Sequence, residues 1–172
     1  MKGPRYWPKF WVTAGYLGFA PGAPGTCGTL GGFLLALLVN RYTDLPQIRA
    51  YALCSLLALF CGVTLLYGDW AEREFGRKDP PQAVSDEVAG FLLSVLMLPP
   101  LREGWEEAKL GAAFALFRLF DIWKPGPIRR LQALPGGAGI LLDNLAAGLL
   151  ANACLQVVLR YPLRGLLLYT GL

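Results

Sequence analysis

Carboxylates gather at the start of one apolar stretch of the chain. Asp86 and Glu87 are adjacent and precede the apolar run from Val88 to Leu101, and Asp79 lies in a polar turn just upstream. Carboxylates at a helix N-terminus are ordinarily caps, worth about 0.5 to 2 kcal/mol. A cap explains one acid. Three acids beside an apolar helix favour a site for a hard cation such as Mg²⁺, which binds carboxylate oxygens.

A second group of charges is set among aromatic residues in the segment LFRLFDIWKPGPIRRL, residues 116–131. Arg118, Asp121 and Lys124 recur at intervals of three, so one face of a helix can carry all of them. Two interpretations remain open for this group. The cations could bind phosphate beside a carboxylate, or the charges could form an internal ion pair that makes their burial tolerable.

Two glycine-rich segments carry the remaining candidates. In GGAGILLDNLAAG, residues 136–148, Asp143 and Asn144 lie about one turn inside an apolar stretch, so the acid needs a partner such as a metal ion, a substrate or Arg118. In PGAPGTCGTLGG, residues 21–32, backbone NH groups around Thr26 and Gly28 could face an anion at a helix N-terminus. The alternative for the second segment is a turn with small residues for close helix contacts.

The composition is that of a membrane protein. Of 172 residues, 55% are hydrophobic and 16% are charged, and the mean hydropathy is +0.43. These charges are too few to cover the surface of a soluble domain of this length. We therefore expect a single all-α domain over residues 1–172, an integral membrane helical bundle.

Five apolar segments are the candidate helices of this bundle. Residues 50–68 form 19 residues without a charge, close to the ~20 that cross a bilayer. The other segments, which are charged or shorter, are residues 28–40, 88–101, 110–123 and 139–159. We expect about five helices, with four or six as alternatives, because short segments can tilt or pack away from lipid.

The orientation follows from the basic residues. If five helices alternate in direction, all the polar motifs lie on one face, and that face holds 10 of the 16 Lys and Arg: Lys2, Arg5, Lys9, Arg73, Arg77, Lys78, Arg118, Lys124, Arg129 and Arg130. Loops rich in Lys and Arg stay in the cytoplasm. The polar motifs are therefore expected at the cytoplasmic membrane interface.

Other chemistries are excluded or less favoured. The chain has no histidine, which excludes Ser-His-Asp and phosphohistidine mechanisms. The spacing of Cys154 and Arg160 matches a cysteine phosphatase, but these residues belong to an apolar helix rather than a phosphate-binding loop. A transporter or channel subunit, with Asp121, Asp143 and Arg118 along an ion path, is the alternative function. It predicts polar residues along whole helices, whereas here they gather at one end.

Four segments together resemble one family. The order, spacing and residue identities of four segments resemble those of phosphatidylglycerophosphatase A, from about residue 15 to residue 150. The segments are APGTCGTLGG, DPPQAVSDEVAG, FRLFDIWKPGPIRRL and GGAGILLDNLAAG. The resemblance implies a multi-pass enzyme of the bacterial inner membrane that uses Mg²⁺. Its partner would be a phospholipid and not a nucleic acid. It would remove the terminal phosphate of phosphatidylglycerophosphate on the cytoplasmic leaflet.

The resemblance also implies roles for individual residues. The acidic positions of the family fall on Asp79, Asp86, Glu87, Asp121 and Asp143, its basic pair on Arg118 and Lys124, and its first loop on Thr26. We expect a metal site from Asp86, Glu87, Asp143, Asp79 and Asn144. We expect phosphate binding by Arg118, Lys124, Thr26 and Gly28, and Asp121 or Asp79 as the base. The family usually has a second aspartate where this chain has Asn144, which keeps a carbonyl oxygen but loses a negative charge.

Overall fold

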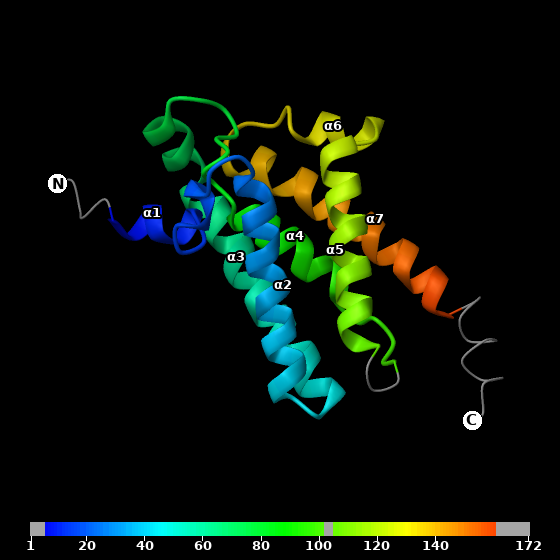
Figure 1. The fold of residues 1–172 in the computed structure, drawn as a ribbon. Coiled ribbons are helices and arrows are strands. Elements are labelled where there is room, and N and C mark those ends of the chain that lie inside the picture. The colour runs from blue at the N-terminus through cyan, green and yellow to red at the C-terminus, as the bar shows by residue number, and fades with distance from the viewer. Residues whose placement is uncertain (1–5, 102–104, 161–172) are drawn as a thin grey trace, which may run out of the picture.

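The computed structural model describes residues 6–101 and 105–160, and within these ranges it is entirely helical (Figure 1). Lys2 and Arg5, which counted toward the predicted orientation, lie outside the described residues. The elements in chain order are α1 (Tyr6–Val12), a 3₁₀ turn η1 (Leu17–Phe19), α2 (Pro24–Tyr42), α3 (Pro46–Phe75), α4 (Ser85–Val95), α5 (Glu106–Trp123), α6 (Gly126–Leu131) and α7 (Gly136–Arg160).

The all-α prediction is confirmed, whereas the number and bounds of the helices differ from it. The five expected segments correspond to α2, α3, α4, α5 and α7, and the described residues add the short helices α1 and α6. Helix α2 begins four residues earlier than expected, at Pro24, because proline is favoured in the first turn of a helix. Helix α4 ends at Val95, short of the expected Leu101, ahead of two prolines that cannot donate a helical hydrogen bond.

The short helix α4 is the core of the bundle. It contacts α2, α3, α5 and α7, and Val88, Phe91 and Leu92 on it are fully buried. Its 11 residues span only about 16 Å, too little to cross a bilayer. The apolar run that the sequence offered as a membrane segment is therefore a helix enclosed by longer helices.

Glycines bring α7 into backbone contact with its neighbours. A Cβ atom added at Gly90 of α4 would lie 2.7 Å from the carbonyl oxygen of Asn144 on α7, and Gly148 abuts Gly90 in the same way. Gly68 of α3 lies against Gly137 of α7. Small residues of this kind let helices approach closely, and here they fix the start of α7 against α4 and the end of α3.

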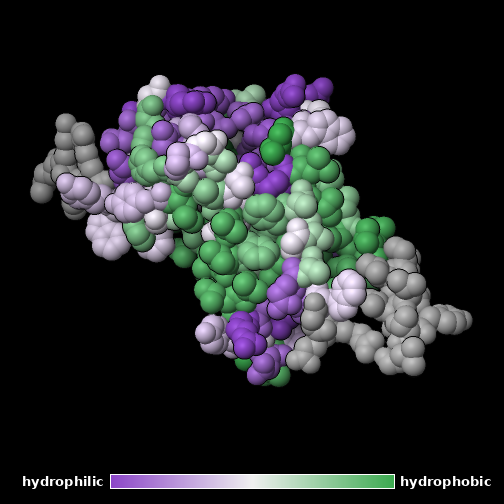
Figure 2. Space-filling view, viewed as in Figure 1, coloured by the Kyte–Doolittle hydropathy of each residue, from purple (hydrophilic) through white to green (hydrophobic). Residues whose placement is uncertain are grey.

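The surface has an apolar belt between two polar ends (Figure 2). Large apolar side chains in the middle of α3 are exposed, among them Leu59, Leu65 and Leu66. Among the described residues, two helices, α3 and α7, are long and apolar enough to cross a membrane by length and composition. Insertion in a membrane thus stays a prediction, with these two helices as its strongest candidates.

Candidate functional site

Four helix ends meet at one polar end of the bundle and carry the predicted residues. Helix α4 starts there with Asp86 and Glu87, and α5 ends there with Asp121. The second turn of α7 brings Asp143 to the same place, and the first turn of α2 closes the site. Asp86 and Asp143 are each only 1% exposed, so these charges lie inside the protein rather than on its surface.

A chain of polar contacts links α4, α7 and α5. The Asn144 side-chain amide donates to Asp86 Oδ2 at 2.6 Å, and the backbone NH of Asn144 donates to Asp143 Oδ1 at 3.0 Å. Lys124 Nζ lies 2.5 Å from Asp143 Oδ2. Asp143 therefore has its partner in Lys124, which is not one of the partners the sequence suggested for it.

Arg118 connects α5 to the first turns of α2. Its Nη1 atom lies 2.5 Å from Asp121 Oδ2 and donates to Thr29 Oγ1 at 3.5 Å. A Cβ atom added at Gly25 would lie 2.6 Å from Glu87 Oε1 and 3.4 Å from Arg118 Nη1. Gly25 thus leaves room for the carboxylate of Glu87 and the guanidinium of Arg118 at the start of α2.

The sequence did not identify Thr29 or Gly25 as site residues. Thr29 looked like part of an apolar helix, and only its position one turn after Gly25 on the same helix face could have revealed it. Of the residues predicted in this segment, Thr26 is half-buried in the first turn of α2, where backbone NH groups lack intrahelical partners. Gly28 lies against Val84, where an added Cβ atom would be 2.6 Å from the Val84 Cβ.

Asp79 lies in the turn between α3 and α4 and is held from two sides. Its Oδ2 atom accepts from Gln132 Nε2 at 2.6 Å, and its backbone NH donates to Glu72 Oε1 at 3.4 Å. Its backbone is in the left-handed region, with φ at 47°. The structure thus connects Asp79 to the segment after α6, beside the cluster rather than within its hydrogen-bonded chain.

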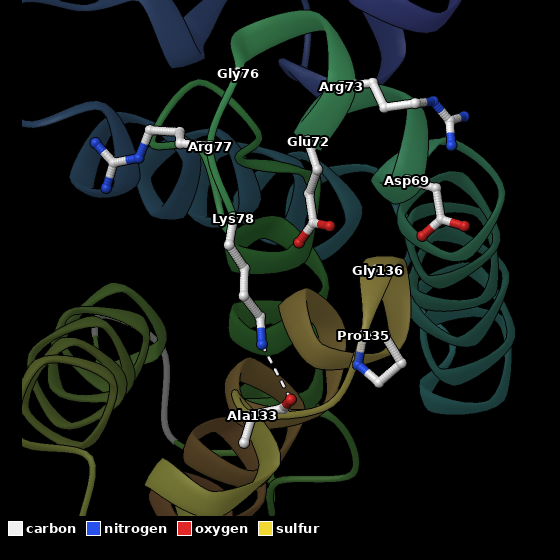
Figure 3. Close-up of a pocket in the computed structure, with 9 residues that line it drawn as sticks. All are labelled: Asp69, Glu72, Arg73, Gly76, Arg77, Lys78, Ala133, Pro135 and Gly136. Atoms are coloured by element: carbon white, nitrogen blue, oxygen red, sulfur yellow. Dashed lines mark hydrogen bonds between the residues drawn. The ribbon is translucent and has the colours of Figure 1, made fainter.

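An open pocket of about 580 Å³ adjoins the site between the end of α3 and the start of α7 (Figure 3). Glu72 and Lys78 point into it, and Lys78 Nζ donates to the carbonyl oxygen of Ala133 at 3.0 Å. Asp69 Oδ1 accepts from the backbone NH of Gly137 at 3.3 Å. Asp69, which the sequence did not single out, therefore holds the start of α7, about two turns before Asp143.

Several oxygens of the cluster have no hydrogen-bond donor. Among the described residues, Asp86 Oδ1, Glu87 Oε2 and Asn144 Oδ1 are buried without a partner. Burial and the neighbouring Glu87 carboxylate raise the pKa of Asp86 well above its usual range, and burial raises the pKa of Glu87 to about 7. Unpaired buried acceptors are costly, and a cation placed among them would favour the charged carboxylates.

These donors fit Mg²⁺ in kind. No group of three Asp, Glu, His or Cys side chains within the described ranges is arranged to hold a metal. The unpartnered oxygens comprise two carboxylates and one side-chain amide, and hard cations take such oxygen ligands together with water and phosphate. Asp143 and Asp79 of the predicted set are already bonded to Lys124 and Gln132.

Comparison with known proteins agrees with the sequence motifs. A family model described as "Phosphatidylglycerophosphatase A" matches residues 10–159. A protein of Bacteroides thetaiotaomicron named "Putative phosphatidylinositol-3-phosphatase" is 34% identical over 149 residues, 86% of this chain and 91% of the relative.

Two relatives carry the family name itself. "Phosphatidylglycerophosphatase A" of Escherichia coli is 32% identical over 142 residues, 82% of this chain and 77% of the relative. The protein of the same name from Haemophilus influenzae is 34% identical over 140 residues, 78% of this chain and 80% of the relative. No solved structure shows a significant match to the chain.

Proposed function

Because the chain belongs to the phosphatidylglycerophosphatase A family, we propose that it hydrolyses the terminal phosphate monoester of phosphatidylglycerophosphate in a Mg²⁺-dependent reaction. The products are phosphatidylglycerol and phosphate. The observation that carries this proposal is the group of buried, unpartnered oxygens of Asp86, Glu87 and Asn144 at one polar end of an apolar bundle, with Arg118 close by.

Asp86, Glu87 and Asn144 would hold the metal ion, and Asp143 and Asp79 are the further candidates from the sequence. Bound Mg²⁺ supplies positive charge to the phosphate and lowers the pKa of water. The amide that Asn144 donates to Asp86 Oδ2 at 2.6 Å fixes the orientation of both side chains. In the proposed site this contact directs the remaining oxygen of each residue, Asp86 Oδ1 and Asn144 Oδ1, toward the ligand.

Arg118 and Lys124 would bind the phosphate oxygens. Each now contacts one carboxylate, Asp121 and Asp143 respectively, and each has further N–H donors that those contacts do not use. The two carboxylates hold the cations in place, which is the preorganisation that stabilises charge in a transition state. NH groups around Thr26 in the first turn of α2 are additional donors. The base is Asp121 or Asp79.

The apolar belt suits a lipid substrate. If the apolar belt (Figure 2) lay in the bilayer, the cluster at the start of α4 would lie at headgroup depth. A phospholipid would keep its acyl chains in the membrane while its terminal phosphate reaches Arg118. We place the protein as a multi-pass protein of the bacterial inner membrane with this end in the cytoplasm, on the basis of its basic residues.

A second substrate is favoured by one comparison. The relative from Bacteroides thetaiotaomicron is named for phosphatidylinositol 3-phosphate. This lipid shares with phosphatidylglycerophosphate a phosphate monoester carried on a phosphodiester headgroup, so the same cations and metal would serve both. The two substrates differ in the polyol between the phosphates, and direct comparison of their turnover decides between them.

The test is phosphate release by purified protein from each lipid in detergent micelles, with Mg²⁺ or with EDTA. Wild type is compared with Asp86→Asn and with the matched control Asp44→Asn, which changes an exposed aspartate. We expect Mg²⁺-dependent release from phosphatidylglycerophosphate that falls by about 10²- to 10³-fold in Asp86→Asn and is unchanged in Asp44→Asn. Release that persists in EDTA, or in a folded Asp86→Asn protein, would contradict the proposed site.

A further inference from the structure

A second charged pocket lies at the end of the bundle opposite the candidate active site. Its volume is about 290 Å³, and it lies between the α2–α3 turn and the segment that joins α4 to α5. Asn40, Arg49 and Lys109 supply its polar groups, and apolar side chains such as Leu53 and Val95 form most of its wall. In Figure 2 this end is the second polar region, on the far side of the apolar belt.

Two cations share one carboxylate at this pocket. Lys109 is only 7% exposed, and its Nζ lies 2.6 Å from Glu106 Oε2 and 3.1 Å from the carbonyl oxygen of Pro99. Arg49 Nη1 is 3.9 Å from the same Glu106 oxygen, and Nη2 donates to the carbonyl oxygen of Thr43 at 3.2 Å. Glu106 therefore balances one of the two cations, and the described residues that line the pocket include both cations and no carboxylate.

One buried donor of Arg49 has no acceptor. Its Nε atom is buried and has no hydrogen-bond partner among the residues that the structure describes. A buried guanidinium N–H without an acceptor is costly, and a phosphate oxygen is the acceptor that matches it in charge and geometry. The two cations in the lining therefore favour a headgroup with a net negative charge, in which no cationic group accompanies the phosphodiester.

The surroundings select a lipid over a free anion. Met97 lines the pocket and is 72% exposed, and Ile48 and Leu45 beside Arg49 are also exposed. These exposed apolar side chains lie at the pocket or beside Arg49, so acyl chains of a lipid would pack against them while its headgroup enters the pocket. A volume of about 290 Å³ is that of roughly ten water molecules, enough for a phosphate with part of a glycerol.

We propose that this pocket binds an anionic phospholipid of the leaflet opposite the active site, with its phosphodiester on Arg49 and its acyl chains against the apolar belt. The proposal rests on the membrane insertion proposed above and does not depend on which lipid is hydrolysed. The bound lipid would hold the α2–α3 turn against the start of α5, where Arg49 and Lys109 both contact Glu106.

Lipid retention in native mass spectrometry tests the proposal. Protein purified in detergent is titrated with phosphatidylglycerol or with phosphatidylcholine of the same acyl chains, as wild type, Arg49→Gln and Arg41→Gln. Arg41 is exposed at the same end of the bundle and does not line the pocket, so its variant controls for general attraction between charges. Lipid in the active site contributes equally to all three proteins, and the difference between them therefore reports on the pocket.

We expect wild type and Arg41→Gln to retain one more phosphatidylglycerol than phosphatidylcholine, and Arg49→Gln to bind this lipid at least about tenfold more weakly. Ala50→Phe, which fills the pocket and keeps Arg49, should lose the same lipid. Equal retention of both lipids by wild type, or unchanged retention in either folded pocket variant, would overturn the proposal. Displacement of the lipid by excess inorganic phosphate would also overturn it, by showing a site for free anions.

Hydrolysis measured on the same proteins separates this proposal from the proposed function. Arg49 and the active site lie at opposite ends of the bundle, so Arg49→Gln should retain phosphatase activity. A wild type that hydrolyses no lipid but retains the extra phosphatidylglycerol would contradict the proposed function and support the lipid site. A wild type that hydrolyses its substrate and retains no extra lipid would do the reverse.

Discussion

The two ends of the bundle both bury charged side chains, but with opposite balance. At the candidate active site, four carboxylates surround two cations, and at the opposite end two cations surround one carboxylate. The first group is Asp86, Glu87, Asp121 and Asp143 with Arg118 and Lys124, and the second is Arg49 and Lys109 with Glu106.

The two clusters also differ in which of their buried groups lack a hydrogen-bond partner. Glu106 and Lys109 bond each other, and each bonds the backbone as well, Glu106 through the NH of Leu101 at 2.7 Å. At the active-site end the buried atoms of the described residues that lack a hydrogen-bond partner are chiefly acceptors, among them Asp86 Oδ1 and Glu87 Oε2, whereas at the opposite end they include a donor, Arg49 Nε. A cation would satisfy the first set and an anion would satisfy Arg49, so each end leaves unpaired the groups that its proposed ligand would match.

The largest expected effect comes from removing a cation at the active-site end. Arg118→Gln should lower kcat/KM for phosphatidylglycerophosphate by about 10³-fold, because the phosphate loses a charged donor and Asp121 loses its partner. Steady-state phosphate release in micelles measures it. Arg129→Gln, at an exposed position on α6, is the control. A loss smaller than tenfold would show that Arg118 only pairs with Asp121.

The corresponding change at the opposite end should affect stability and spare activity. Glu106→Gln leaves Lys109 buried without a carboxylate, so the free energy of unfolding should fall by about 3 kcal/mol. Denaturant titration in detergent measures this change, and Glu107→Gln at the exposed neighbouring position is its control. Loss of kcat in the folded Glu106→Gln protein would refute the separation of roles between the two ends.

Asn144→Asp should destabilise the active-site end when no cation is bound. Without metal, Asp86 would face a carboxylate in place of the amide that now donates to it at 2.6 Å, and stability should fall by about 1 to 2 kcal/mol. Added Mg²⁺ should then raise the thermal midpoint more than it does in wild type.

The control for this response is Asn152→Asp, farther along the same helix. Asn152 donates to the carbonyl oxygens of Leu93, Ser94 and Leu96, so Asn152→Asp should destabilise the protein while its midpoint shift with Mg²⁺ stays that of wild type. An equal shift of the midpoint with Mg²⁺ in wild type and Asn144→Asp would show that position 144 does not contact the cation.

The smallest effect is expected at Thr29. Thr29→Val removes the hydroxyl that accepts from Arg118 at 3.5 Å, a long hydrogen bond, so activity should fall only a few-fold, about 0.5 to 1 kcal/mol. Kinetics on the folded variant measure it. Thr29→Ser keeps the hydroxyl and should restore wild-type activity, whereas equal losses in both variants would assign Thr29 to helix contacts alone.

The sequence predicted the class of fold better than the place of each helix in it. An apolar run of about a dozen residues is compatible with a lipid-facing segment and with a buried helix, and only the tertiary contacts of α4 distinguish them. Helices α1 and α6 have seven and six residues, too few for a periodic pattern to identify.

The site was predictable where an unusual residue type revealed it. Asp86, Glu87 and Asp143 were visible as acids in apolar surroundings, and the three-residue spacing of Arg118 and Asp121 predicted a contact that the structure shows. The partner of Lys124 was not predictable, because Asp143 lies 19 residues away and reaches it only through the placement of α7 on α5. The roles of these residues in metal and phosphate binding stay predictions.

The glycine contacts of α7 determine which positions of this protein tolerate substitution. Exposed apolar side chains such as Leu66 make few contacts with the rest of the chain. Replacing them with residues of similar hydrophobicity would therefore leave the helices where they are. At Gly90 and Gly148 a single methyl group would separate α4 from α7. That separation would also part Asp86 from Asn144, so two residues that take no part in the chemistry should be as intolerant of substitution as the site itself.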